Sequence, residues 1–405
     1  MSAPRSFTSR DFLLALAGFF FLFMAVSLFF LFPVVLEAFG SSPGRIGLIM
    51  GVYSVVAIAI RPLFGRMIDL RGGKRLAVAG AALLLVTTPL FHLVRDAGWL
   101  PLALRAVAGV GWGVSMTATI ALCSDLAPAD RLAKTMGVIG VAGLVANAVG
   151  PLVAEELLRG AGGPGRLYNV SAAFLAAALV CLLLAREGSC RPEDGGGGEG
   201  GRRPAGLPAL RAVPWALAAI IAGMPVFHGA IRGAMIYFVA VFGHSIGIAR
   251  VGTFFLVFSL AAILTRVRLS DLSDRRGRKT VIWPAALIIA GNLFVLAQVR
   301  SLPLLVVTGF VGGIGQGLIF PALSTYIIDF LGRENKGLAI SLYNSLFDVG
   351  MGLGSPVFGW ISDAAGYRWM YRFAALLLLG ATAVFMAKAP VTEGRARAGM
   401  ASGGR

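Results

Sequence analysis

The stretch GRMIDLRGGKR occupies residues 65–75, and a related stretch, DLSDRRGRK, occupies residues 271–279. Residues inside and outside these stretches recur at an offset of 204–205 positions. The matched pairs are Arg61/Arg266, Asp69/Asp274, Gly72/Gly277, Lys74/Lys279, Gly109/Gly313, Gly111/Gly315, Gly113/Gly317, Asp125/Asp329 and Pro151/Pro356. Apolar helices share composition by chance, but they do not share polar landmarks in register over about 90 residues. The sequence therefore contains a tandem repeat, which is typical of membrane proteins built from two related bundles.

The segments around these landmarks are long and apolar. Of the 405 residues, 57% are hydrophobic and 14% are charged, whereas soluble chains have about 25% charged residues. This composition excludes a water-soluble globular fold and a disordered chain. A helix crosses the hydrocarbon core with about 20 apolar residues. We predict twelve such helices, at residues 12–36, 46–68, 76–95, 99–125, 134–157, 167–186, 213–242, 251–270, 280–299, 302–330, 336–362 and 369–388.

The predicted fold is an all-α membrane protein with twelve transmembrane helices in two pseudo-symmetric six-helix bundles. The first bundle covers residues 1–186 and the second covers residues 213–405. Between them, residues 187–212 are rich in Gly and Pro and predict a flexible cytoplasmic linker. Strand-like alternation typical of an outer-membrane barrel is absent from the sequence.

The net charge of +17 comes from 36 Lys and Arg residues against 19 Asp and Glu residues. Most of the basic residues lie in alternate loops, on the side that also carries both termini. By the positive-inside rule these loops and the termini face the cytoplasm, which predicts a multi-pass protein of the inner membrane. The charge therefore mainly sets topology and does not indicate a nucleic-acid partner. Cys123, Cys181 and Cys190 fit neither a disulfide framework nor a metal site, and we expect no metal and no cofactor.

The two loop stretches resemble the G-x-x-x-D-R-x-G-R-[RK] loop of the major facilitator superfamily. The first copy departs from it at Leu70 and Gly73, and the second has Ser270 in place of Gly. In the family this loop is thought to latch one conformation on the cytoplasmic side. The resemblance assigns that role to Gly65, Asp69, Arg71, Gly72, Lys74, Asp274, Gly277 and Arg278. A simpler interpretation is that the basic residues are only topology anchors.

Two further elements resemble this family. Arg105, Gly109 and Gly111 are similar to its R-x-x-x-G-x-G element, whose Arg is implicated in proton coupling. A snorkelling Arg near the outer surface is the simpler interpretation. Gly150-Pro151 resembles a helix-5 element of exporters that work by antiport, although generic helix packing also explains small residues there.

The predicted mid-membrane polar groups define the candidate site. An ionisable residue inside a membrane is costly and indicates function by default. We expect substrate contacts from Arg105, Arg232, His228, Gln316, Asn147, Tyr237 and Asn344, and proton coupling by Asp348, His228 and Arg105. The simpler interpretations are a packing histidine at His228 and a structural Arg232–Asp348 ion pair. Arg61 and Arg266 are expected to tie their helices to the following acidic loop residues.

These patterns and the resemblance predict a proton-coupled transporter that exports a small organic compound by alternating access. The excess of Arg105 and Arg232 over Asp348 favours an anionic compound. An uptake symporter of an organic anion, a passive facilitator and a non-transporting receptor are the alternatives. Enzyme chemistry is not indicated, since no Ser-His-Asp arrangement and no G-x-x-x-x-G-K-[ST] stretch occurs in the sequence. The expected partners are a small-molecule substrate, protons and membrane lipid, and the expected state is a monomer.

Overall fold

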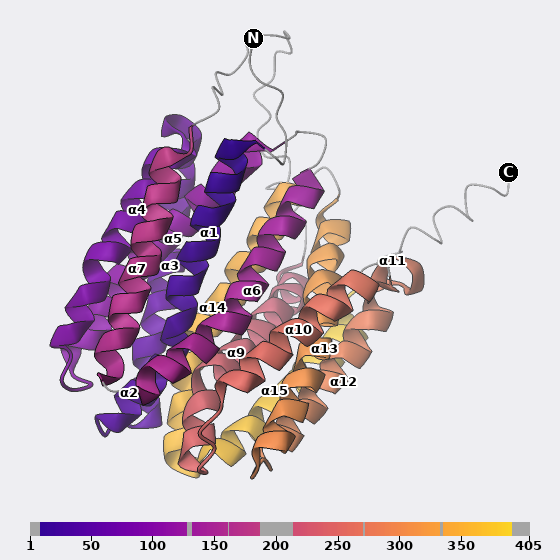
Figure 1. The fold of residues 1–405 in the computed structure, drawn as a ribbon. Coiled ribbons are helices and arrows are strands. Elements are labelled where there is room, and N and C mark those ends of the chain that lie inside the picture. Colours follow the sequence, from indigo (N-terminus) through magenta and orange to yellow (C-terminus); the bar gives the residue numbers. More distant parts are fainter. Residues whose placement is uncertain are drawn as a thin grey trace, which may run out of the picture. The chain divides into compact units, whose positions relative to one another are not determined.

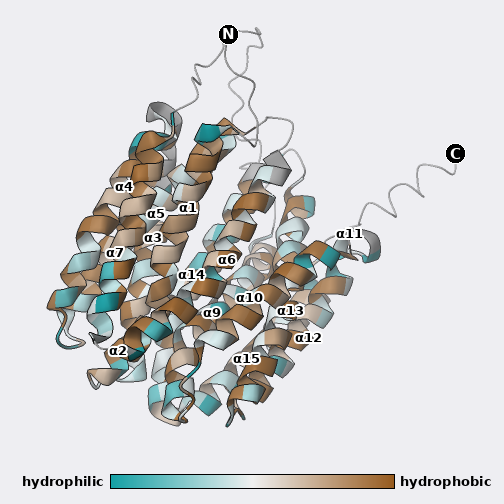
Figure 2. Cartoon of the chain, in the orientation of Figure 1, coloured by the Kyte–Doolittle hydropathy of each residue, from teal (hydrophilic) through white to brown (hydrophobic). Residues whose placement is uncertain are grey.

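The computed structural model describes residues 9–127, 132–160, 162–186, 214–269, 272–332 and 335–390. Every secondary-structure element within these ranges is a helix. The predicted linker at 187–212 lies outside them. Hydrophobic residues run along the helices, and hydrophilic residues gather toward the helix ends (Figure 2).

The described helices belong to two compact units, and each is described by itself. The first unit includes α1 (Arg10–Leu28), η1 (Phe29–Leu31), α2 (Phe32–Ala38), α3 (Pro43–Arg71), α4 (Gly73–Thr87), η2 (Thr88–Leu93), α5 (Trp99–Leu126), α6 (Leu132–Arg159) and α7 (Gly163–Leu184). The second unit includes α9 (Trp215–Ser245), α10 (Gly252–Leu269), α11 (Leu272–Arg276), α12 (Arg278–Leu296), α13 (Leu302–Leu331), α14 (Lys336–Ala365) and α15 (Tyr367–Lys388). Arg250–Leu256, which includes the start of α10, groups with the first unit. Figure 1 labels the α-helices.

Eleven of the described helical segments are long and apolar enough to cross a membrane. The twelfth predicted span, 336–362, corresponds to α14, a helix of 30 residues that is not among the eleven. The first predicted span, 12–36, is not one regular helix. It changes to a 3₁₀ turn at Phe29–Leu31 and continues as α2, which has Pro33 in its first turn. Proline fits there because the first turn of a helix leaves its N–H groups without intrahelical acceptors.

The tandem repeat seen in the sequence reappears as repeated packing within each unit. A methyl group placed on Gly109 of α5 would lie 2.5 Å from the carbonyl oxygen of Tyr53 on α3. In the second unit, a methyl group on Gly313 of α13 would meet the carbonyl oxygen of Phe258 on α10. Tyr53 and Phe258 are 205 positions apart, so the same helix crossing occurs twice. Glycine is needed at both crossings because the backbones approach too closely for any side chain.

Replacing Gly109 by Ala is expected to destabilise the first unit, because the added carbon must push the α3 backbone away. Overpacking of this kind costs about 1–3 kcal/mol in the free energy of unfolding. Gly140 on α6 is the matched control, since nothing lies within 4 Å of a carbon added there. Gly140→Ala should be neutral or slightly stabilising. Thermal unfolding in detergent measures both, and equal melting temperatures would contradict the packing described above.

Candidate functional site

Arg105 lies in the second turn of α5 and points into the first unit. Its side chain is buried, with 4% of its surface exposed, so it does not snorkel out of the bundle. The guanidinium carbon lies 4.2 Å from the centre of the Tyr53 ring and 5.8 Å from that of Phe29. A cation over an aromatic face is stabilised by the ring quadrupole, and more strongly where water is excluded. The buried charge of Arg105 is therefore held partly by aromatic rings.

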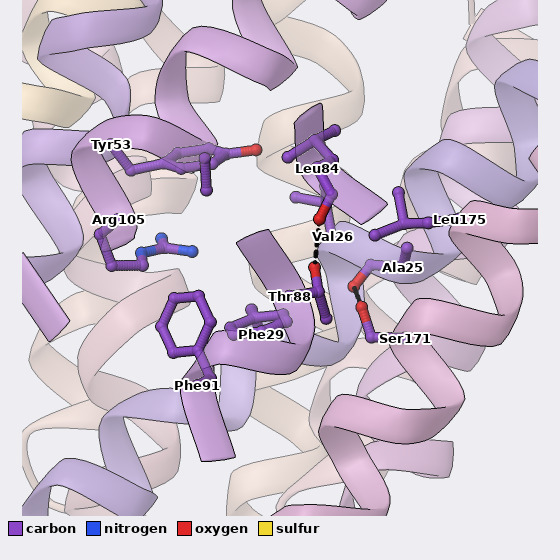
Figure 3. A pocket seen from close by; sticks show the side chains of 11 residues that line it. Ala25, Val26, Phe29, Tyr53, Leu84, Thr88, Phe91, Arg105, Ser171 and Leu175 are labelled. Carbon is purple, nitrogen blue, oxygen red and sulfur yellow. Dashed lines mark hydrogen bonds between the residues drawn. The ribbon is translucent and has the colours of Figure 1, made fainter. Parts of the chain in front are cut away.

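A small cavity adjoins this guanidinium. Tyr53, Phe29, Phe91 and Arg105 line one part of it, and Thr88 and Ser171 line another (Figure 3). The hydroxyls of Thr88 and Ser171 turn toward carbonyl oxygens of Leu84 and Ala25, respectively, and donate to them. The cavity volume is about 20 Å³, which is the size of about one water molecule. In this conformation the cavity is too small for an organic compound.

Arg232 on α9 is the corresponding buried cation of the second unit. It is 8% exposed, and its guanidinium carbon lies 4.3 Å from the centre of the Phe258 ring. In the described part of the chain it forms neither a hydrogen bond nor an ion pair. The Arg232–Asp348 ion pair considered in the sequence analysis is therefore not formed. A buried charge without an anionic partner is costly, and at Arg232 the Phe258 ring offsets part of this cost.

The rings under the two arginines are related by the repeat, because Tyr53 and Phe258 stand 205 positions apart. The arginines themselves are not related. Arg105 corresponds to Gly309 at an offset of 204, and Arg232 corresponds to Ser27 at an offset of 205. Each unit thus places a guanidinium on an equivalent ring but supplies it from a different helix. The two rings are therefore a repeat pair, whereas the two cations above them are not.

His228 lies one turn before Arg232 and joins three helices. Its Nε2 is 2.8 Å from Oε1 of Gln316 on α13, and its Nδ1 is 3.2 Å from the hydroxyl of Tyr343 on α14. In a neutral ring, Nε2–H donates to Gln316 and Nδ1 accepts from Tyr343. In a protonated ring, Nδ1–H donates to the Tyr343 oxygen after the hydroxyl rotates. The network therefore accommodates both protonation states without losing a hydrogen bond. Tyr343 is not among the site residues that the sequence predicts, although it contacts His228 directly.

The expected tie between Arg266 and the acidic loop after α10 falls on Asp271 and Asp274, whose side chains lie outside the described residues. The guanidinium carbon of Arg266 lies 5.0 Å from the centre of the Phe320 ring on α13, and its buried Nε has no hydrogen-bond partner. The charges of Arg232 and Arg266 both act on the His228 ring. The charge of Arg266 also acts on Tyr343, as does that of Asp348. The second unit thus gathers two cations, a histidine, a carboxylate and several rings.

The remaining predicted site residues are less closely joined to these groups. Tyr237 is buried on α9 and acts electrostatically on Arg232. Asn344 and Asp348 are half-buried on α14. Asn147 is half-buried on α6, and its Oδ1 is buried with no hydrogen-bond partner. The structure brings His228 and Gln316 into direct contact, whereas Asn147 and Arg105 belong to the other unit.

The predicted latch residues are partly described. Gly72 and Gly277 have φ values of 84° and 92°, which favour glycine, and each joins two helices. Arg278 is buried and donates from Nε to Asp329 Oδ2 at 2.7 Å. Lys74 Nζ donates to the Leu183 carbonyl oxygen at 2.9 Å. The surroundings of Gly65 and the side chains of Asp69, Arg71 and Asp274 are not among the described features.

Lys279 is the residue of the second repeat that corresponds to Lys74, and it also donates a hydrogen bond to a backbone carbonyl oxygen. Its Nζ lies 2.9 Å from the Met386 carbonyl oxygen. Both lysines therefore hold carbonyl oxygens near the carboxyl end of the last helix of their unit, where a cation is favoured by the helix dipole. The loop thus has a packing role in each unit, in addition to its charge.

Comparison with known proteins agrees with this repeated architecture. A family model described as Major Facilitator Superfamily matches residues 14–299 and 272–402. An uncharacterized MFS-type transporter of Salmonella typhimurium is 23% identical over 352 residues, covering 84% of this chain and 86% of its own length. Multidrug resistance protein MdtG of Serratia proteamaculans is 25% identical over 338 residues, covering 82% of this chain and 81% of its own. The structure of a bacterial homolog of the human lysosomal transporter Spinster, inward-facing and unoccupied, matches with a TM-score of 0.80 at 15% identity, covering 95% of this chain and 98% of that one. The resemblance drawn from the repeated loop is confirmed, and the chain is a membrane transporter, not an enzyme, that belongs to the major facilitator superfamily.

Proposed function

We propose that the chain is a proton-coupled secondary transporter that exports a small organic anion by alternating access. The anionic nature of the substrate is inferred from Arg232. This arginine is 8% exposed and has no hydrogen-bond or ion-pair partner among the described residues. Arg105 adds a second buried cation in the first unit. Cations that line a binding site concentrate ligands of opposite charge.

Export is supported by the relative named as a multidrug resistance protein. The sequence contains no P-loop, so an ion gradient must supply the energy, and His228 is a group on which a proton can be held. The topology that accompanies this proposal is an inner-membrane monomer with both termini in the cytoplasm.

Uptake by proton symport is a second candidate, and the position of His228 one turn from Arg232 favours it. Symport requires that the substrate and the proton bind together, whereas antiport requires that they bind alternately. An anion on Arg232 and a proton on His228, one turn away, attract each other. This attraction favours joint binding, so the direction of proton movement is the decisive observation.

A flux experiment separates these outcomes. The protein is reconstituted in liposomes that contain a pH-sensitive dye, and aromatic and aliphatic carboxylates and phosphate esters are added one at a time. We expect at least one anion to be transported and to move protons in the opposite direction. Proton movement in the same direction would establish symport instead. Transport of anions without proton movement would indicate a facilitator, and transport restricted to cations or neutral compounds would overturn the anion proposal.

A further inference from the structure

The helices α9 and α14 end, and α15 begins, at one end of the second unit (Figure 1). A second hollow lies among these helix ends. Its volume is about 330 Å³, which is large enough for a small ligand. Its lining includes Phe242, Ser245, Tyr367, Arg368, Trp369 and Arg372. None of these residues belongs to the group around His228, so the hollow is separate from the candidate substrate site.

The two arginines of this hollow carry charge that the described chain does not balance. Arg368 and Arg372 are four residues apart and so lie on one face of α15. In the described ranges neither forms an ion pair with a carboxylate, and Arg372 lies over the Trp369 ring, 4.8 Å from its centre. Both stand in the first two turns of α15, where the helix dipole disfavours cations, and the first turn has no acidic residue. An anionic ligand would balance the charge of the two guanidinium groups and would offset their unfavourable interaction with the helix dipole.

The hollow also lies beside a buried polar group that lacks a partner. The Tyr371 side chain is fully buried, and its hydroxyl has no hydrogen-bond partner. The Tyr371 ring packs edge-on against Phe242, a residue of the hollow, with 5.6 Å between their centres. An unpartnered buried hydroxyl is costly. Tyr371 itself does not line the hollow, so its hydroxyl marks an unsatisfied polar group in the layer of side chains next to the lining residue Phe242.

The surface that continues from the hollow is apolar. Trp369, Phe373 and Leu376 are 58%, 44% and 59% exposed, and their spacing places them in one stripe along α15. Since α15 is a candidate membrane span that begins at Tyr367, the hollow lies where the span meets the headgroup layer, the level at which Trp is enriched. A cationic hollow joined to an apolar stripe matches a molecule with a phosphate head and an acyl chain.

We propose that this hollow binds the headgroup of an anionic phospholipid. Arg368 and Arg372 hold the phosphate, the aromatic residues cover the glycerol, and an acyl chain follows the stripe from Trp369 to Leu376. A soluble anion would use the arginines but would gain nothing from the stripe. This site does not depend on which substrate the protein transports.

Lipid binding to the purified, delipidated protein tests this assignment. Phosphatidylglycerol and phosphatidylcholine are titrated into detergent micelles, and bound lipid is counted by native mass spectrometry. Wild type should prefer phosphatidylglycerol. The double variant R368Q/R372Q should bind it roughly 30-fold more weakly, given the usual contribution of each basic residue to anionic-lipid binding. R368K/R372K should retain most of the binding, since it keeps both charges.

Arg300 supplies the matched control, because it is an exposed arginine in the segment between α12 and α13 and does not line the hollow. R300Q should bind phosphatidylglycerol as wild type does. An equal loss in R300Q, or unchanged binding in R368Q/R372Q, would overturn the site. Displacement of the lipid by millimolar inorganic phosphate would assign the hollow to a soluble anion instead. If the double variant does not fold, the single variants should each show a loss of about fivefold.

Discussion

Replacing Arg232 by Gln is expected to slow the transport of an organic anion by about 30-fold or more. Arg232 is the buried cation over Phe258 that has no anionic partner among the described residues, so the bound substrate would be its main counter-ion. Removing one partner of a buried charge pair costs about 2–5 kcal/mol, and each 1.4 kcal/mol is a factor of ten. The measurement is the initial rate of substrate flux in proteoliposomes that contain equal amounts of folded protein.

Two further variants make this result specific. Arg232→Lys keeps the charge but loses the planar group that stacks on a ring and binds a carboxylate with two hydrogen bonds, so we expect an intermediate rate. Arg268→Gln removes an exposed cation from α10 in the same unit and should leave the rate unchanged. A wild-type rate in Arg232→Gln would contradict the anion site. So would an equal loss for neutral and anionic substrates.

Much of the helix packing in each unit follows from the sequence, because glycines in register imply close helix crossings. Gly109 and Gly313 meet the backbones of Tyr53 and Phe258, two residues that are themselves a repeat pair. The positions of Gly72 and Gly277 between helices follow from the same pattern. The break at Phe29–Leu31 does not follow from it, since an apolar run gives no sign of a local change in helix type.

The candidate site is predicted less completely, because side-chain contacts depend on how each helix is rotated. His228 and Tyr343 are 115 positions apart, and nothing in the spacing joins them. Charge pairing suggests Asp348 as the partner of Arg232, yet the observed partner is the Phe258 ring. Aromatic residues are common in apolar helices, so their role under a cation is not visible in the sequence. The Phe320 ring under Arg266 is a second example, since the sequence links Arg266 only to the acidic loop that follows it.

Replacing His228 by Gln is expected to separate substrate exchange from proton coupling. The variant keeps a polar side chain between Gln316 and Tyr343 but cannot take up a proton. Exchange of labelled for unlabelled substrate, which needs no net proton movement, should stay within about threefold of wild type. Accumulation driven by a pH gradient should fall to the equilibrium level, which is the larger effect. His92→Gln is the matched control, because His92 is exposed and its ring contacts Asn169 at 2.8 Å in the first unit.

The alternative carrier of the proton is Asp348, and the comparison with Asp348→Asn identifies which group acts. Arg232 and Arg266 act on the ring of His228, so binding of an anion near Arg232 changes the field at that ring. If His228→Gln alone loses gradient-driven accumulation, the coupling passes through the three-helix network of His228, Gln316 and Tyr343. If Asp348→Asn alone loses it, His228 has a packing role and the proton is held on α14. Full accumulation in both variants would remove the second unit from proton coupling and leave Arg105 of the first unit as the remaining predicted group.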